Sequence, residues 1–139
     1  MKKEIKFLWE WWSNNPQAKR DKKYEYGDCV IRAIGRVTGM GWYELYDLLT
    51  EKGFELCDCW AQKQVYEAVL KDLGFVWVSC PRTKGVKAMY VAEFIKKHEK
   101  GSYILRLAHH LTAVVDGCCY DVWYPQNDSV YGYWTKIIK

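Results

Sequence analysis

The chain has 139 residues, of which 50% are hydrophobic and 17% aromatic, and its formal net charge is +4. This length suits one compact domain and is too short for two ordinary ones, and the composition excludes a disordered chain. No apolar run approaches the length of a membrane span, and the first residues contain no signal-peptide core. We therefore expect a cytoplasmic protein with no membrane contact.

The six cysteines fit that location as reduced thiols rather than disulfides. Cys57-Asp58-Cys59 and Cys118-Cys119 lack the Cys-x-x-Cys spacing of zinc sites, and no His-x-x-x-His accompanies them. The sequence therefore predicts no metal and no cofactor.

The N-terminal segment predicts a short amphipathic helix. Ile5, Leu8, Trp9 and Trp12 recur at helical spacing, and the stretch 13–16, SNNP, ends the pattern. Phe7 and Trp11 would then point to another side of this helix, which implies either burial on two sides or a surface that contacts a protein partner. We expect residues 1–23 to form this helix and a following loop at the periphery of the domain.

That loop carries the one concentration of positive charge. Two tyrosines lie close to its basic residues, a combination that suits contacts to a phosphate backbone, to stacked bases or to a protein partner. The residues concerned are Lys19, Arg20, Lys22, Lys23, Tyr24 and Tyr26. We favour a solvated loop, so nucleic acid is not the expected partner.

Three more helices are expected in the first half of the chain. One runs from Asp28 or Cys29 to about Thr38, with Asp28 as its N-cap and Gly39 after its end. The next two cover 42–51 and 61–73, and each should end at a glycine, Gly53 and Gly74.

The second half changes to the period of strands. We expect strands over 75–79, 103–107, 111–115, 120–123 and 132–138, with a helix over 91–97. Helices followed by an antiparallel sheet make one α+β domain over residues 1–139.

Three segments supply the parts of a thiol nucleophile site. Cys29 lies at a predicted helix N-terminus, where the helix dipole favours the thiolate. His110 stands at the start of one strand and Asp121 on the next, as a base and the acid that orients it. Each residue alone has a plain structural explanation, but the arrangement of all three together favours a catalytic site.

The turn between these strands decides which histidine faces the acid. Asp116-Gly117 is typical of a two-residue hairpin turn, which would pair Val115 with Cys118. Alternation then places His110 and Asp121 as diagonal neighbours on one face and His109 on the other. A three-residue turn would reverse the assignment and make His109 the alternative base.

These residues resemble the papain-like cysteine peptidases, especially small bacterial and phage-type members. The segment 27–34, GDCVIRAI, resembles their nucleophile helix, and 110–117, HLTAVVDG, with 120–123, YDVW, resembles their histidine and acid strands. The resemblance implies helices packed on a C-terminal antiparallel sheet, with Cys29 as nucleophile, His110 as general base and Asp121 orienting the imidazole. It also implies a peptide or protein substrate and a thioester intermediate.

One departure from this family concerns the oxyanion hole. The glutamine that such enzymes carry shortly before the nucleophile is absent from 22–28, KKYEYGD. The Cys29 amide remains as a donor, with Gln17, Tyr24 and Tyr26 as side-chain candidates. Trp42, Trp60, Trp77 and Trp123 either line a groove for an extended peptide or belong to the core.

Two further alternatives stay open. Water or a second amine as acceptor would make the enzyme a hydrolase or a transferase, respectively. A non-catalytic protein-binding module on the same fold, such as a phage-type inhibitor or adaptor, would keep the helix geometry while its thiol stayed inert.

Overall fold

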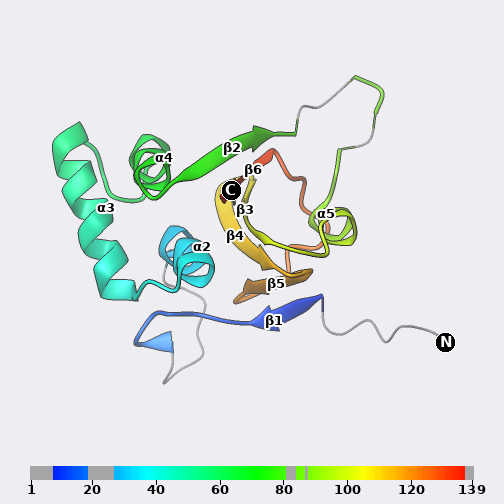
Figure 1. Ribbon diagram of the computed structural model, residues 1–139, viewed down its shortest axis with the longest axis horizontal. Coiled ribbons are helices and arrows are strands. Elements are labelled where there is room, and N and C mark those ends of the chain that lie inside the picture. Colours follow the sequence, from blue (N-terminus) through cyan, green and yellow to red (C-terminus); the bar gives the residue numbers. More distant parts are fainter. Residues whose placement is uncertain (1–7, 19–26, 81–83, 87, 137–139) are drawn as a thin grey trace.

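A six-stranded sheet forms the centre of the computed structural model, which describes residues 8–18, 27–80, 84–86 and 88–136 (Figure 1). The strands lie in the order β1-β5-β4-β3-β6-β2, and neighbours are antiparallel except for the parallel pair β1 and β5. Their bounds are β1 Trp9–Trp11, β2 Phe75–Ser79, β3 Ser102–Leu107, β4 His110–Val115, β5 Cys118–Asp121 and β6 Gly132–Lys136. The predicted α+β class is confirmed.

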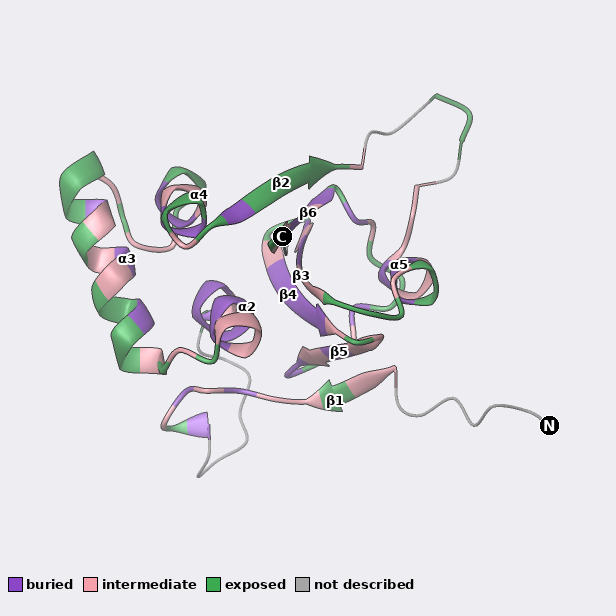
Figure 2. Cartoon of the chain, in the orientation of Figure 1, coloured by how far each residue is buried: buried purple, intermediate pink, exposed green. Residues whose placement is uncertain are grey.

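Helices cover both faces of this sheet. Their bounds are α2 Cys29–Thr38, α3 Trp42–Leu56, α4 Lys63–Asp72 and α5 Val91–Lys97. One core joins α2, α3 and α4 to one face through residues such as Ile34, Leu49 and Ala113, and a second joins α5 to the other face through Phe94 and Val114. Most of α2 is buried, whereas α3 has a long exposed side (Figure 2).

The β4–β5 hairpin forms as the sequence predicts. Asp116 and Gly117 both have positive φ, 47° and 78°, as a tight two-residue turn requires. Val115 pairs with Cys118, so the predicted register is confirmed. Strand β5 starts directly after this turn and ends at Asp121, two residues before the predicted end at Trp123.

The predicted N-terminal helix is wrong where the structure can test it. Trp9–Trp11 is a strand that pairs in parallel with β5, and the predicted residues up to position 7 lie outside the described part. The exposed Glu10 between half-buried Trp9 and Trp11 fits a strand at a sheet edge, so pairing with β5 overrides the helical spacing. The loop after it, Ser13 to Pro16, is non-helical as predicted, and Ser13 and Asn15 are buried.

Helix α3 continues past the glycine that was predicted to stop it. Gly53 is buried inside the helix, which ends at Leu56 and is followed by Cys57 in the left-handed conformation, with φ 55°. A Cβ on Gly53 would lie 2.6 Å from the backbone oxygen of Asp58. Gly53 therefore serves close packing against the following loop and not helix termination. Helix α4 likewise starts later than predicted, at Lys63, and ends near the predicted Gly74.

Candidate active site

Cys29, His110 and Asp121 come together at one end of the sheet. They are the first residue of α2, the first of β4 and the last of β5. His110 Nε2 lies 2.6 Å from Asp121 Oδ2, and the Cys29 thiol lies beside the same imidazole, close enough for His110 to lower its pKa. Since Nε2 is engaged by the carboxylate, Nδ1 is the ring nitrogen left for the sulfur. The predicted proximity of His110 and Asp121 is confirmed.

The three residues meet at the strand ends and not across the middle of a sheet face. Val114 and Cys119 lie on the His110 face of the hairpin and pack in the core beneath α5, whereas Leu111 and Ala113 pack with α2. His110 reaches Cys29 because β4 begins where the N-terminus of α2 lies.

The surroundings favour a thiolate and an imidazolium. Burial by itself would raise the pKa of Cys29, but the hydrogen bond and charge of His110, the Leu111 backbone amide and Arg32 lower that pKa below its ordinary value. Burial by itself would lower the pKa of His110, but hydrogen bonds to Asp121 and Cys29 raise it to about 9. Both shifts favour the thiolate–imidazolium pair over the neutral thiol and imidazole.

Other thiols shift in the opposite direction. Burial raises the pKa of Cys80, of Cys118 and of Cys119, the last to about 12. Burial of a cysteine in this fold therefore produces an inert thiol unless a base and a cation lie beside it, as they do at Cys29.

A buried arginine, which the sequence analysis missed, fixes the acid. Arg32 Nη1 donates to Asp121 Oδ1 at 2.6 Å, and the Val122 amide donates to the same oxygen at 2.7 Å. Burial opposes ionisation of Asp121, but His110 and Arg32 together lower its pKa. Both carboxylate oxygens are thus occupied, which leaves Asp121 charged and limits its rotation.

Asp28 occupies the predicted N-cap position but does not cap the helix with its side chain. Its Oδ1 accepts from Arg32 Nε at 2.8 Å, while its Oδ2 accepts from Asn15 Nδ2 and Trp42 Nε1, both at 3.0 Å. The i,i+4 spacing of Asp28 and Arg32 was a readable signal for an ion pair. The second partner of Arg32, 89 residues away, had no local signal.

Trp123 lies against His110, with ring centroids 5.0 Å apart. It lies two residues after the end of β5 and is 41% exposed, so it covers His110 from one side. The other three tryptophans named above do not border the cavity at Cys29. Trp42 and Trp60 pack against the helix-side core, and Trp77 contacts Trp134.

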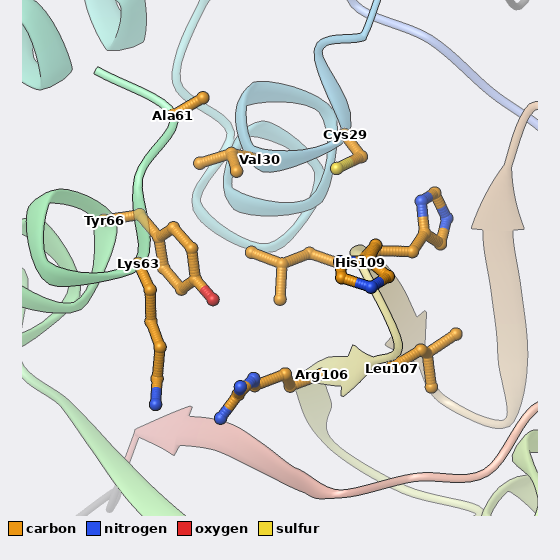
Figure 3. Close-up of a pocket in the computed structure, with 10 residues that line it drawn as sticks. Cys29, Val30, Ala61, Lys63, Tyr66, Arg106, Leu107 and His109 are labelled. Atoms are coloured by element: carbon orange, nitrogen blue, oxygen red, sulfur yellow. The ribbon is translucent and has the colours of Figure 1, made fainter. Parts of the chain in front are cut away.

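An open cavity of about 300 Å³ borders the sulfur of Cys29 (Figure 3). The reacting end is formed by Cys29 and His110, and the walls by the apolar side chains of Val30, Ala61, Leu107 and Leu111. The rest of the lining comes from Arg106, Lys63, Tyr66 and His109. The thiolate is therefore accessible to a small group or a single side chain.

The remaining candidates occupy different places. Gln17 is exposed and does not line this cavity, while Tyr24 and Tyr26 lie outside the described residues, as do the basic residues from Lys19 to Lys23. His109 lines the cavity from the β3–β4 turn, with a positive φ of 54°, but Asp121 bonds to His110 and not to His109. Cys29 is the first residue of α2, so its backbone amide has no acceptor within the helix and remains a candidate oxyanion donor.

Within residues 8–18, 27–80, 84–86 and 88–136, no group of three or more His, Cys, Asp or Glu side chains is placed to hold a metal ion. No helix in these same ranges is long and apolar enough to cross a membrane. Comparison of the chain with protein families, with curated proteins and with solved structures found no match.

Proposed function

We propose that this protein is a cysteine hydrolase, a peptidase or amidase of the papain-like type, that acts through Cys29, His110 and Asp121. One observation carries the proposal: His110 bonds to Asp121 at 2.6 Å and lies beside the Cys29 thiol, and both Cys29 and His110 border an open cavity. A structural role for Cys29 would not need an ionised partner, an oriented acid and access to solvent at the same place.

The acylation step follows from this geometry. The Cys29 thiolate attacks the carbonyl carbon of an amide and forms a carbon–sulfur bond, while the carbonyl oxygen takes up negative charge near the α2 N-terminus. The His110 imidazolium gives its proton to the leaving nitrogen as the carbon–nitrogen bond breaks. Asp121, held by Arg32, keeps the imidazole in place.

Deacylation reverses the roles. Neutral His110 takes a proton from water, the resulting hydroxide attacks the thioester, and the carboxylic acid leaves as the carbon–sulfur bond breaks. An amine in place of water would give acyl transfer. Because the cavity is open to solvent, we favour hydrolysis.

The test is the pH dependence of Cys29 alkylation by iodoacetamide, measured by peptide mass spectrometry. The exposed Cys57 and Cys59 serve as internal references in the same sample. We expect Cys29 to react at a lower pH than these references, and His110→Asn to slow its labelling at pH 6.5 by roughly tenfold or more because the ion pair is lost. The matched control is His109→Asn, which removes the neighbouring histidine and suits the positive φ at that position.

Two results would contradict the proposal. Labelling of Cys29 no faster than of the references, and indifferent to His110→Asn, would favour a non-catalytic binding module on this fold. A loss of labelling in His109→Asn alone would move the base to His109.

A further inference from the structure

The cavity beside Cys29 has one reacting end and one basic end. Arg106, from β3, and Lys63, from the start of α4, extend into the same region, and the Tyr66 hydroxyl points toward them (Figure 3). The sulfur of Cys29 lies on the opposite side of the cavity. Three hydrogen-bond donors, two of them cationic, therefore converge at a distance from the nucleophile.

Arg106 is the group whose charge is least compensated. Among the residues that the structure describes, no carboxylate lies within ion-pair distance of it. Lys63 Nζ lies 3.6 Å from Glu67 Oε1, but the lysine side chain is 56% exposed, so this pair is weak. The basic end thus keeps a net positive charge that the described residues do not neutralise.

Tyr66 links the two ends. Its side chain is almost completely buried, burial raises its pKa, and the charges of Arg106, Glu67 and Cys29 all act on its phenol. The hydroxyl therefore stays protonated and available as a donor. Apolar walls between the ends lower the local polarity, which strengthens any ionic contact made there.

We infer that this cavity binds a carboxylate of the substrate, with Arg106 as the principal contact and Lys63 and Tyr66 as supporting donors. The inference rests on the proposed function, because it assigns the group recognised beside the scissile bond. A guanidinium forms two parallel hydrogen bonds with a carboxylate, a geometry that a single ammonium cannot match. The carboxylate belongs either to an acidic side chain or to a peptide C-terminus.

The charges also orient the substrate. A carboxylate is repelled by the Cys29 thiolate and attracted by Arg106, so it must lie at the basic end. Its amide carbonyl then lies toward the nucleophile. The volume of about 300 Å³ is at the small end of ligand pockets, so one acidic residue fills the site better than an extended peptide does.

Three matched alkylating reagents test this assignment at Cys29. N-iodoacetyl-glutamine amide is neutral, N-iodoacetyl-glutamate amide carries a side-chain carboxylate, and N-iodoacetyl-glutamine carries a terminal carboxylate. For each, the labelling rate of Cys29 is divided by that of the exposed Cys57 in the same sample. We expect one of the two anionic reagents to exceed the neutral one by roughly tenfold, the effect of one charge-assisted contact, and the better one identifies the source of the carboxylate.

Variants test whether Arg106 causes the preference for the anionic reagent. Arg106→Gln should abolish most of this preference, and Arg106→Lys should retain part of it. The control Lys71→Gln removes one exposed charge on α4 outside the cavity and should leave the ratio of anionic to neutral labelling unchanged. Circular dichroism confirms that each variant is folded.

The outcomes separate the two proposals. Rapid labelling by the neutral reagent with no anionic preference, or with a preference that survives Arg106→Gln, overturns the carboxylate site and leaves the hydrolase intact. Slow labelling of Cys29 by every reagent, at the rate of Cys57, overturns the hydrolase and the carboxylate site together.

Discussion

Replacing Arg32 by methionine should destabilise the protein far more than most single substitutions do. Arg32 bonds to Asp28 at 2.8 Å and to Asp121 at 2.6 Å, and the three side chains are only 8%, 3% and 1% exposed. Methionine fills a similar volume but leaves two buried carboxylates without their cation. Removal of one partner from a buried ion pair costs about 3–5 kcal/mol, and so little exposure leaves no reason to reduce that figure.

The assay is urea unfolding of the native protein and of Arg32→Met at pH 7 and pH 5. In the native protein the pKa of Asp121 is lowered, so its stabilisation is lost only as the pH falls below the ordinary range and is still present at pH 5. In the variant Arg32 no longer helps His110 to oppose the burial of Asp121, so the pKa of Asp121 rises relative to the native protein, and protonation relieves the repulsion as the pH falls. The loss of stability should therefore be smaller at pH 5 than at pH 7.

Arg36→Met is the matched control, one helical turn further along α2. The Arg36 guanidinium lies 3.7 Å from the centre of the Tyr120 ring and is held by a cation–π contact, so its loss should cost about 1 kcal/mol. Adding Asp28→Asn to Arg32→Met should recover part of the stability. A cost for Arg32→Met no greater than for Arg36→Met, or one independent of pH, would refute the reasoning.

Three further predictions concern the ion pair and the packing of α3. Asp121→Asn should lower the pKa of His110 from about 9, because the hydrogen bond from His110 to the Asp121 carboxylate is the main cause that raises this pKa. NMR titration of the His110 ring protons measures the pKa, and an unchanged value would contradict the prediction. In Cys29→Ala, Asp121 still raises the pKa of His110 in the folded protein above its unfolded value of about 6.5. The stability that charged His110 contributes at low pH should therefore be lost as the pH rises through its folded pKa. Urea unfolding at pH 6 and pH 9.5 measures this loss, and equal stability at the two pH values would contradict it. Gly53→Ala should destabilise the protein by about 1–3 kcal/mol, although alanine normally stabilises a helix relative to glycine, because the new Cβ would lie 2.6 Å from the Asp58 backbone oxygen. A rise in melting temperature would show that the loop at Asp58 moves away to accommodate it.

Local patterns were enough to predict the parts of the site that depend on the hairpin. The turn at Asp116-Gly117 determines the register of β4 and β5, and the register determines that His110 meets Asp121. Helix α2 and α5 were also predicted closely, because each combines a clear apolar face with a defined end.

The errors have a common physical origin in contacts between distant segments. Trp9–Trp11 forms a strand because β5 offers an unpaired edge, and Gly53 stays helical because the loop at Asp58 packs against it. Arg32 was missed for the same reason, since its second carboxylate comes from the other half of the chain. Spacing within a segment carries no information on such partners.

The salt bridge between Arg32 and Asp121 joins residues 89 positions apart, and this separation affects the order in which the site forms during folding. A chain made from its N-terminus presents Cys29 long before His110 and Asp121 exist, and closure of so long a loop comes late in folding. Until the β4–β5 hairpin docks, Cys29 is an ordinary thiol with an ordinary pKa. The lowered pKa of Cys29 therefore appears only after His110 and Asp121 have been made and have folded onto α2, which makes the alkylation rate of Cys29 a reporter of finished folding.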